Sequence, residues 1–386
     1  MTAIRLFDRR IGGHTRTIAV MSSARHGSLV IADIGGYTRY LSGVELEHST
    51  DVLADLLETV LKALEPNFRI AKLEGDAVFA YDDGRADGAV AVDALTGAYI
   101  AFMRRRRTIV QLNTCPCDAC RAIGSLGLKI VAHRGDYATH EIAGATELVG
   151  PEVILVHRLL KNDVVERTGI SDYALYTDAF VRELALTPGA LGWRRDSLAY
   201  EDVGKIDVHV DDLGSRWRGE AGTPKHLIPE ADGATVIWEL PAPPPIVWEH
   251  LSHPEQVVRF MADQASQTSP GGARGPGTST HCVHGSHSYD LEVLDWIPYE
   301  LQSLRFGTRG LTFLYNSIYE EIPGGSTRLT ARIAPLAPRF AGVLFPLVKR
   351  GIRKEYEGWM RALEELLRAE KNEAAATEEQ PAITQA

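Results

Sequence analysis

The sequence predicts an α+β protein of two domains, and three observations support this prediction. Short apolar runs that end at glycine turns alternate with stretches whose leucines recur at helical spacing. A polar segment rich in Gly and Pro, residues 214–233, has no apolar face and separates two regions of different composition. The chain of 386 residues is also longer than one hydrophobic core usually serves.

The first domain is expected over residues 27–213. Residues 28–32 form an apolar run typical of a buried strand, and Asp33 follows it directly. A helix then begins at Ser49 or Thr50, either of which suits a helix N-cap, and it stops before Pro66. The further predicted elements are strands at 68–72, 77–81 and 126–133 and helices at 86–103 and 151–160.

The second domain is expected over residues 234–370. A strand and a helix behind a proline run open it, four strand-like runs follow, and a long amphipathic helix closes it. The predicted bounds are 236–240 and 243–251 for the opening elements and 287–296, 299–307, 311–321 and 326–333 for the four strands. Residues 1–26 are interpreted as a basic arm without regular structure, with Met21 as an alternative start to Met1, and residues 371–386 as a disordered tail.

Composition excludes several classes of protein. A net charge of −10 argues against nucleic acid as a partner. No apolar run reaches the roughly 18 residues that a membrane-spanning helix needs, and the first residues lack the order of a signal peptide. Four cysteines are too few for a disulfide framework, so a cytoplasmic location is expected.

Two aspartates are the first candidates for chemistry. Asp33 and Asp76 each follow a strand-like run at a glycine turn, where a ligand has room to bind. Carboxylates that converge from adjacent strand ends suit hard divalent cations such as Mg²⁺. The alternative is that both are simple strand-end turn residues, with Lys72 an ordinary solvated side chain.

The pair, with its strand–helix–hairpin setting, resembles the signature of the class III nucleotide cyclases over residues 28–82 and more loosely to about residue 213. The resemblance implies a ferredoxin-like cyclase domain that converts ATP to cyclic AMP and pyrophosphate as a homodimer. It also implies two Mg²⁺ or Mn²⁺ ions held by Asp33, Asp76 and the carbonyl of Ile34. Lys72 takes the place of a purine contact, and a lysine there is similar to adenylate cyclases.

The later part of the family pattern covers residues 147–158 without gaps. The resemblance implies a second purine contact at Glu147 and a transition-state arginine at Arg158. Ile154 stands where the family has the asparagine that orients the ribose, and isoleucine makes no such hydrogen bond. Asn162 lies one helical turn beyond Arg158, so it could take the place of the missing asparagine only after a register shift. For Glu147 and Arg158 the alternative is a surface ion pair.

Cys115, Cys117 and Cys120 form the next constellation. Three thiols in six residues resemble three ligands of a tetrahedral zinc site, with His133, His140 or Cys282 as candidates for the fourth. The alternatives are reduced thiols in a loop between helix and strand, or a redox sensor.

The element order of the second domain resembles the START-like helix-grip fold of polyketide cyclases and lipid-transfer domains. The resemblance implies an apolar cavity for a hydrophobic small molecule or lipid. The candidate lining residues are Trp296, Phe306, Phe313, Tyr315 and Trp359, and the alternative is that these aromatic residues are simply core.

Three functions remain open at this stage. One is an adenylate cyclase regulated by a hydrophobic ligand in the second domain. Another is a catalytically impaired sensor or scaffold that binds nucleotide, ligand or both. In the third, the START-like domain is itself an enzyme on a polyketide-like substrate.

Overall fold

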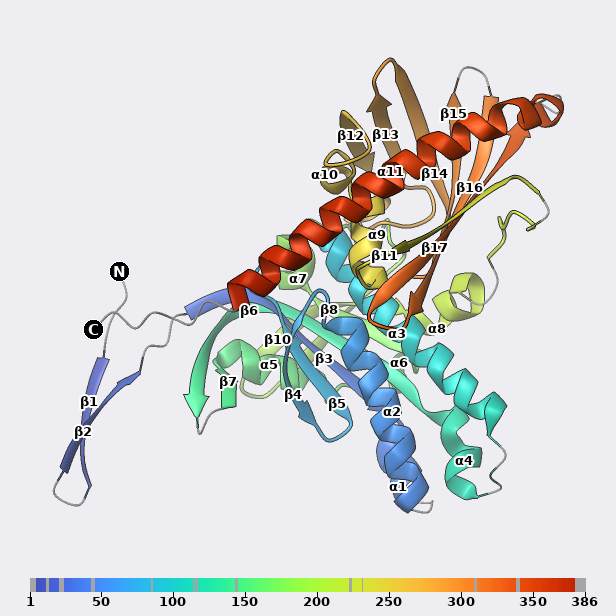
Figure 1. Cartoon of the computed structure of the whole chain (residues 1–386). Helices are drawn as coiled ribbons and strands as arrows, with labels where there is room; N and C mark the ends of the chain where they lie inside the picture. The colour runs from blue at the N-terminus through green and yellow to red at the C-terminus, as the bar shows by residue number, and fades with distance from the viewer. Residues whose placement is uncertain are drawn as a thin grey trace. The chain divides into compact units, whose positions relative to one another are not determined.

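The chain forms two compact units, residues 1–217 and 218–386, and the boundary between them lies inside the polar segment 214–233 (Figure 1). The computed structural model describes residues 5–11, 14–20, 24–42, 46–84, 86–113, 115, 117–142, 145–221, 224–230, 232–308, 311–337 and 341–378. In this part of the chain no helix has the length and the apolar character needed to cross a membrane.

A mixed sheet forms the centre of the first unit. Its strand order within the described residues is β4-β5-β3-β6-β8-β10-β9, with β7 paired to β6. β6 and β8 run parallel, and the other neighbours run antiparallel. The strands are β3 (Ala24–Gly35), β4 (Arg69–Glu74), β5 (Ala77–Tyr81), β6 (Gly127–Ile142), β7 (Ala145–Val149), β8 (Tyr173–Thr177), β9 (Arg194–Tyr200) and β10 (Gly204–Asp212).

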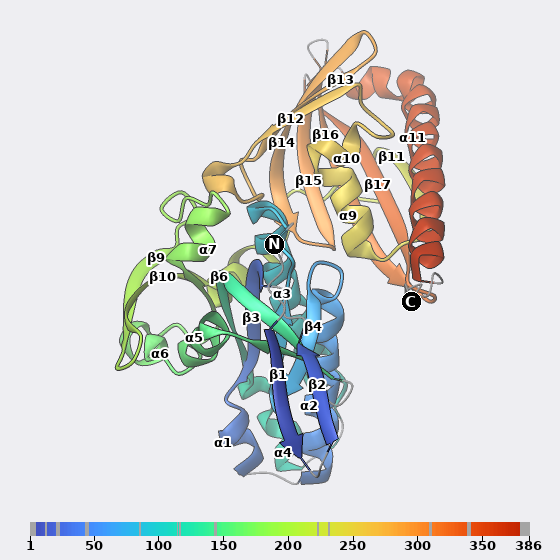
Figure 2. The ribbon, with the colours of Figure 1, turned by 90° about the vertical axis from the view of Figure 1, so that its left-hand side faces the viewer.

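Helices cover this sheet on both faces. α2 and α3 pack against each other, α2 on β4 and β5 and α3 on β6, while α5 packs on β3 and β6 (Figure 2). The helices are α1 (Tyr37–Ser42), α2 (Leu46–Leu64), α3 (Gly88–Leu112), α4 (Asp118–Ala122), α5 (Pro151–Leu159), α6 (Val164–Thr168), α7 (Asp178–Glu183) and α8 (Leu213–Arg216), with short turns at Ile123–Ser125 and Trp217–Ala221.

Alternation along β3 decides which face carries the candidate site. Leu29 and Ile31 are buried in one cluster with Val156 of α5. Because successive strand residues point to opposite faces, Asp33 continues the row of Leu29 and Ile31 and lies on the α5 face. The fold therefore places Asp33 at the end of an apolar row, beside the helix that carries the predicted catalytic residues.

Several elements of this unit differ from the sequence-based expectations. α2 begins at Leu46 and buries Ser49 inside the helix, so Ser49 is not its cap. α3 continues to Leu112 because its four consecutive arginines are good helix formers. Residues 1–26, expected to lack regular structure, contain an antiparallel pair, β1 (Arg5–Ile11) and β2 (His14–Val20), whose many arginines hide any apolar alternation in the sequence.

The second unit is an antiparallel sheet with a long C-terminal helix. The strand order among the described residues is β11-β17-β16-β15-β14-β13-β12, and α11 packs on β11 and β17 (Figure 2). The elements are β11 (Ala234–Leu240), α9 (Pro244–Ser252), α10 (Pro254–Val257), β12 (Gln264–Thr268), β13 (Ser279–His284), β14 (His287–Ile297), β15 (Leu301–Thr308), β16 (Leu311–Ile322), β17 (Ser326–Ala337) and α11 (Ala341–Glu378), with a short turn at Pro270–Gly272.

The α+β class predicted from the sequence is confirmed in both units. β12 and β13 were not predicted, because Ser, Thr, Gln and His dominate them and leave little apolar alternation. The predicted tail is helical as far as Glu378, since its Ala and Glu residues favour a helix. Residues 379–386 lie outside the described part of the chain.

The core of the second unit is built around Trp248 of α9, which is fully buried. The rings of Trp296 and Tyr319 lie 4.5 and 5.1 Å from it, centroid to centroid. Met360 and Leu363 of α11 complete the cluster from the helix side.

Candidate functional site

Asp33 and Asp76 lie at neighbouring strand ends in the first unit. The amide of Ile34 donates a hydrogen bond to the Asp76 carbonyl oxygen at 3.0 Å, and Asp33 is paired with Ala77 across β3 and β5. Burial and then the charge of Asp76 raise the pKa of Asp33, and burial also raises the pKa of Asp76. Two neighbouring, partly buried carboxylates, of which Asp76 disfavours the ionisation of Asp33, form a place suited to a cation.

Lys129 of β6 supplies one positive charge to this place. It is paired with Asp33 across β3 and β6, and its Nζ lies 3.7 Å from Asp33 Oδ2. The Lys129 charge acts to lower the pKa of both aspartates, against the effect of burial. The oxygen donors of Asp33 and Asp76 fit a hard divalent ion such as Mg²⁺ or Mn²⁺, but such an ion has to compete with the ammonium group.

Lys72 and Glu147, the predicted nucleotide contacts, meet each other directly. Lys72 Nζ on β4 lies 3.0 Å from Glu147 Oε2 on β7 and 3.2 Å from Glu74 Oε1. The hydrogen bond to Glu147 raises the pKa of Lys72 above its usual value. The lysine is therefore a charged donor that already has two carboxylate partners.

Glu74 and His157 belong to this cluster although the sequence reasoning missed them. His157 Nε2 lies 2.8 Å from Glu74 Oε2, and its ring packs edge-on against Phe79 with 4.9 Å between the ring centroids. The available signals were weak: Glu74 follows Lys72 by two residues on one strand, and His157 precedes Arg158 on α5. The pairing itself depends on how α5 lies across the sheet.

The positions on α5 to which the resemblance assigned catalytic roles are Ile154 and Arg158. Ile154 is 58% exposed, so its side chain faces solvent. Arg158 Nη2 forms an ion pair with Asp202 Oδ2 at 2.8 Å. Ile154 and Arg158 line a shallow hollow of about 480 Å³ together with Val153, His157, Leu160 and Lys161.

Asn162 does not take the place of the asparagine that is missing at position 154. Its Oδ1 accepts hydrogen bonds from the amide of Val164 at 3.0 Å and from the Tyr173 hydroxyl at 2.9 Å. Its Nδ2 donates to the carbonyl of Leu159 at 2.7 Å. These contacts connect the end of α5 to the start of α6, so the amide group has a structural role there.

The three cysteines considered as possible zinc ligands come together. The sulfur atoms of Cys115, Cys117 and Cys120 lie within 4.8 Å of one another. Of the proposed fourth ligands, His133 is hydrogen-bonded to Glu152 at 2.7 Å, and Cys282 belongs to the second unit.

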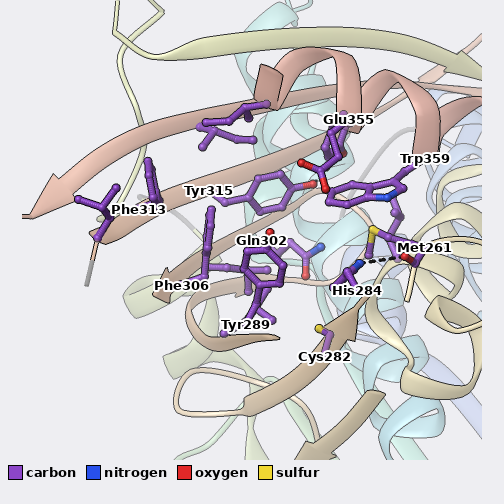
Figure 3. A pocket seen from close by; sticks show the side chains of 17 residues that line it. Met261, Cys282, His284, Tyr289, Gln302, Phe306, Phe313, Tyr315, Glu355 and Trp359 are labelled. Carbon is purple, nitrogen blue, oxygen red and sulfur yellow. Dashed lines mark hydrogen bonds between the residues drawn. The ribbon is translucent and has the colours of Figure 1, made fainter. Parts of the chain in front are cut away.

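An apolar cavity of about 270 Å³ lies in the second unit between the sheet and α11 (Figure 3). Its lining is Leu251, Met261, Cys282, His284, Tyr289, Leu291, Gln302, Leu304, Phe306, Leu311, Phe313, Tyr315, Ile333, Ile352, Glu355, Tyr356 and Trp359. Four of the five aromatic residues predicted to line a cavity are among these residues. Trp296 is not, because Trp248 packs on it and Arg274 lies over its ring at 5.6 Å, so Trp296 belongs to the core.

A few polar groups face this cavity. The hydroxyls of Tyr315 and Tyr356 are hydrogen-bonded to each other at 2.8 Å, and His284 Nδ1 lies 2.9 Å from the carbonyl oxygen of Met261 (Figure 3). Burial raises the pKa of both tyrosines and raises the pKa of Cys282 to about 11, so all three are neutral at pH 7. A mainly apolar lining with a few fixed polar groups is the usual form of a small-molecule site.

Comparison with known proteins gives a family for this chain. The family described as "Protein of unknown function (DUF2652)" matches residues 53–168. The "Uncharacterized protein Rv2561/Rv2562" of Mycobacterium tuberculosis is 35% identical over 170 residues, which are 42% of this chain and 74% of that protein. The chain belongs to the Rv2561/Rv2562 family.

Solved structures with similar parts include the guanylyl cyclase Cya2, with 14% identity, 49% of this chain and 92% of that chain covered, and a TM-score of 0.39. The adenylyl cyclase CyaB from P. aeruginosa has 18% identity over 50% of this chain and 96% of its own, with a TM-score of 0.38. DynU16, a putative protein of the dynemicin biosynthetic locus, has 24% identity over 34% of this Rv2561/Rv2562-family chain and 47% of its own, with a TM-score of 0.29.

Proposed function

We propose that this protein is a small-molecule sensor whose C-terminal unit binds an apolar, aromatic ligand, and whose first unit binds a nucleotide with a divalent cation but turns it over poorly. The observation that carries the proposal is the cavity of about 270 Å³ between the sheet and α11. Stable cores rarely leave such a space empty beside so many aromatic rings. A bound ligand accounts for it.

The lining indicates the class of ligand. Phe306 and Phe313 stack with 5.2 Å between ring centroids and present flat apolar surface. The neutral hydroxyls of Tyr315 and Tyr356 and the ring of His284 offer hydrogen bonds at a few positions. We therefore expect a compact ligand with one or two aromatic rings and one or two oxygen atoms, and not a long acyl chain.

The C-terminal part of the proposal is tested by titrating the full chain with 2-naphthol and following tryptophan fluorescence. Leu304 lines the cavity on β15, so Leu304→Trp should fill it and abolish saturable binding. The next residue, Arg305, points to the opposite face of the strand, so Arg305→Trp is the matched control that keeps binding. The cavity has no such role if wild type does not bind or if Leu304→Trp binds equally well.

The proposal for the first unit depends on Asp33 and Asp76. Their carboxylates would hold Mg²⁺ or Mn²⁺, which neutralises phosphate charge when it is bound. Lys72 supplies a hydrogen-bond donor near Glu147, where the cyclase resemblance implies the purine. Ile154 and the Arg158–Asp202 ion pair argue against efficient catalysis, because a missing preorganised donor typically costs about 10²–10³ in turnover.

A direct assay separates the sensor from an active adenylate cyclase, the second candidate, which the Asp33–Asp76 juxtaposition favours. Wild type and Asp33→Asn are incubated with Mn²⁺ and ATP, and both ATP binding and cyclic AMP are measured. The sensor predicts metal-dependent ATP binding in wild type only, with cyclic AMP at background in both proteins. Cyclic AMP from wild type well above Asp33→Asn would identify a working cyclase.

The cyclase resemblance also implies that two copies share one nucleotide site. We therefore propose that the functional form is a homodimer. Sedimentation equilibrium across a range of protein concentrations tests this part independently of catalysis, and a monomer at all concentrations would contradict it.

A further inference from the structure

The loop after α3 is held in a shape that gathers three thiols. Asn113 forms two hydrogen bonds with the backbone of Cys115, one at 2.9 Å to its amide and one at 3.1 Å to its carbonyl oxygen. Cys117 is the N-cap of α4, and its Sγ accepts a hydrogen bond from the amide of Cys120 at 3.4 Å. As a result the sulfur atoms of Cys115, Cys117 and Cys120 lie within 4.8 Å of one another.

A second, independent feature is the hydroxyl of Tyr40. Tyr40 of α1 is 2% exposed, and its hydroxyl has no hydrogen-bond partner within the described part of the chain. Burial and then the nearby thiols of Cys120 and Cys117 raise the pKa of Tyr40 to about 12. A buried hydroxyl without a partner is costly, and one beside the thiols of Cys117 and Cys120 indicates an additional group between them.

Three thiols this close together are difficult to ionise when no metal ion is bound. If all three thiols lost their protons with no ion bound, three negative charges would lie within 4.8 Å of one another. Within the described residues none of the three forms a disulfide, and each is only partly exposed. A soft divalent cation reverses this situation, because it stabilises thiolates that would otherwise repel one another.

We propose that Cys115, Cys117 and Cys120 bind one zinc ion in a site whose fourth position is open to water or to an exchangeable ligand. Binding converts three thiols to thiolates and releases three protons to solvent, so the complex of one Zn²⁺ with three thiolates carries one negative charge. The Tyr40 hydroxyl donates a hydrogen bond to this thiolate set. Three protein ligands with an open position are typical of zinc sites that exchange a ligand, whereas closed structural sites have four.

The site connects the loop to the chain that follows Asp33. α4 packs on both α1 and α2, and α1 begins at Tyr37, directly after the end of β3. Zinc bound to the cysteines would therefore order α1 through its contact with α4. This consequence is measurable without any nucleotide or activity.

The test uses the full chain purified without chelator. Elemental analysis should give about one zinc per chain, and Co²⁺ added to the chelated protein should produce the intense thiolate charge-transfer band of a tetrahedral site. Cys117→Ser and Cys120→Ser should lose the metal. Cys282→Ser, which removes the remaining cysteine of the sequence, should keep it.

Thiol counting guards against variants that fail to fold. In wild type, chelator should make three additional thiols reactive toward a disulfide reagent and should speed hydrogen exchange in α1. The proposal is overturned by iron with a visible sulfide chromophore in place of zinc. It is also overturned if the chain carries no metal and shows no charge-transfer band with Co²⁺.

Discussion

The ammonium group of Lys129 lies 3.7 Å from the carboxylate of Asp33, opposite it across β3 and β6. The positive charge of Lys129 thus lies next to the two carboxylates to which a divalent ion would bind. Lys129 compensates the repulsion between Asp33 and Asp76 when no ion is bound, and it opposes the ion that would replace it.

Replacing Lys129 should therefore tighten cation binding. In Lys129→Met the apolar stem remains and the charge is removed, so Mn²⁺ should bind at least about tenfold more tightly, a change of about 1.4 kcal/mol. Titration followed by electron paramagnetic resonance measures the dissociation constant. Lys205→Ala, an exposed lysine on β10, is the control and should match wild type. Equal Mn²⁺ affinity in Lys129→Met and wild type would show that the charge does not compete.

Ile154→Asn should restore part of the missing catalytic machinery. Ile154 is 58% exposed, so the substitution should leave stability within about 0.5 kcal/mol. We expect cyclic AMP formation with Mn²⁺ to rise above background, by at most about 10²-fold. Ile154→Ala lacks the amide and should stay at background, as should Ile154→Asn combined with Asp33→Asn. No gain from the asparagine would place the defect elsewhere, with the Arg158–Asp202 ion pair as the next candidate.

Asn162 should affect stability and not nucleotide binding. Asn162→Ala removes the acceptor of the Val164 amide and of the Tyr173 hydroxyl, which should cost about 1 kcal/mol of unfolding free energy. Urea denaturation measures this cost. Asn162→Asp keeps the acceptor oxygen and should recover most of the loss. A change in ATP affinity at unchanged stability would contradict the structural role.

His133 should make the first unit less stable in mild acid. Burial lowers the pKa of His133, and the charge of His26 on β3 acts in the same direction, against the opposing effects of Glu152 on α5 and of Glu183 on α7. Above its ordinary pKa of 6.5 the residue is neutral in both the folded and the unfolded chain and contributes nothing. Below 6.5 the unfolded chain takes up the proton first, so the stability of the folded state falls.

The variant His133→Gln, which does not titrate at this position, isolates this effect. The difference in unfolding free energy between His133→Gln and wild type should move in favour of the variant as the pH falls from about 7.5 to about 5.5. Urea midpoints across that range measure it. A difference that is constant with pH would mean that His133 keeps an ordinary pKa in the folded chain.

Local signals predicted much of the fold. β5 has the expected bounds, and α5 differs by one residue at its end, because an apolar run between turn residues and a proline at the first helical position are local features. β12 and β13 have no such signal, since their residues are mostly polar. Their place at the edge of the sheet is decided by the pairing of β13 with β14 and of β12 with β13.

The site residues that could be predicted from the sequence are those that directly follow a strand or that lie close together in the sequence. Asp33, Asp76 and the three cysteines fall in this class. Lys129 does not, because its position beside Asp33 depends on the register between β3 and β6, which the sequence does not reveal. Trp296 shows the opposite failure: it was expected to line the cavity, but Trp248 from α9 packs on it and makes it part of the core.

The hydrogen bond between the Tyr315 and Tyr356 hydroxyls also bears on which molecules the cavity accepts. One hydroxyl donates in this bond and the other accepts, so one phenolic proton is not used in it. A guest whose oxygen atom reaches that proton gains a hydrogen bond, which a pure hydrocarbon cannot form. The cavity thereby discriminates by the placement of a single oxygen atom as well as by molecular size.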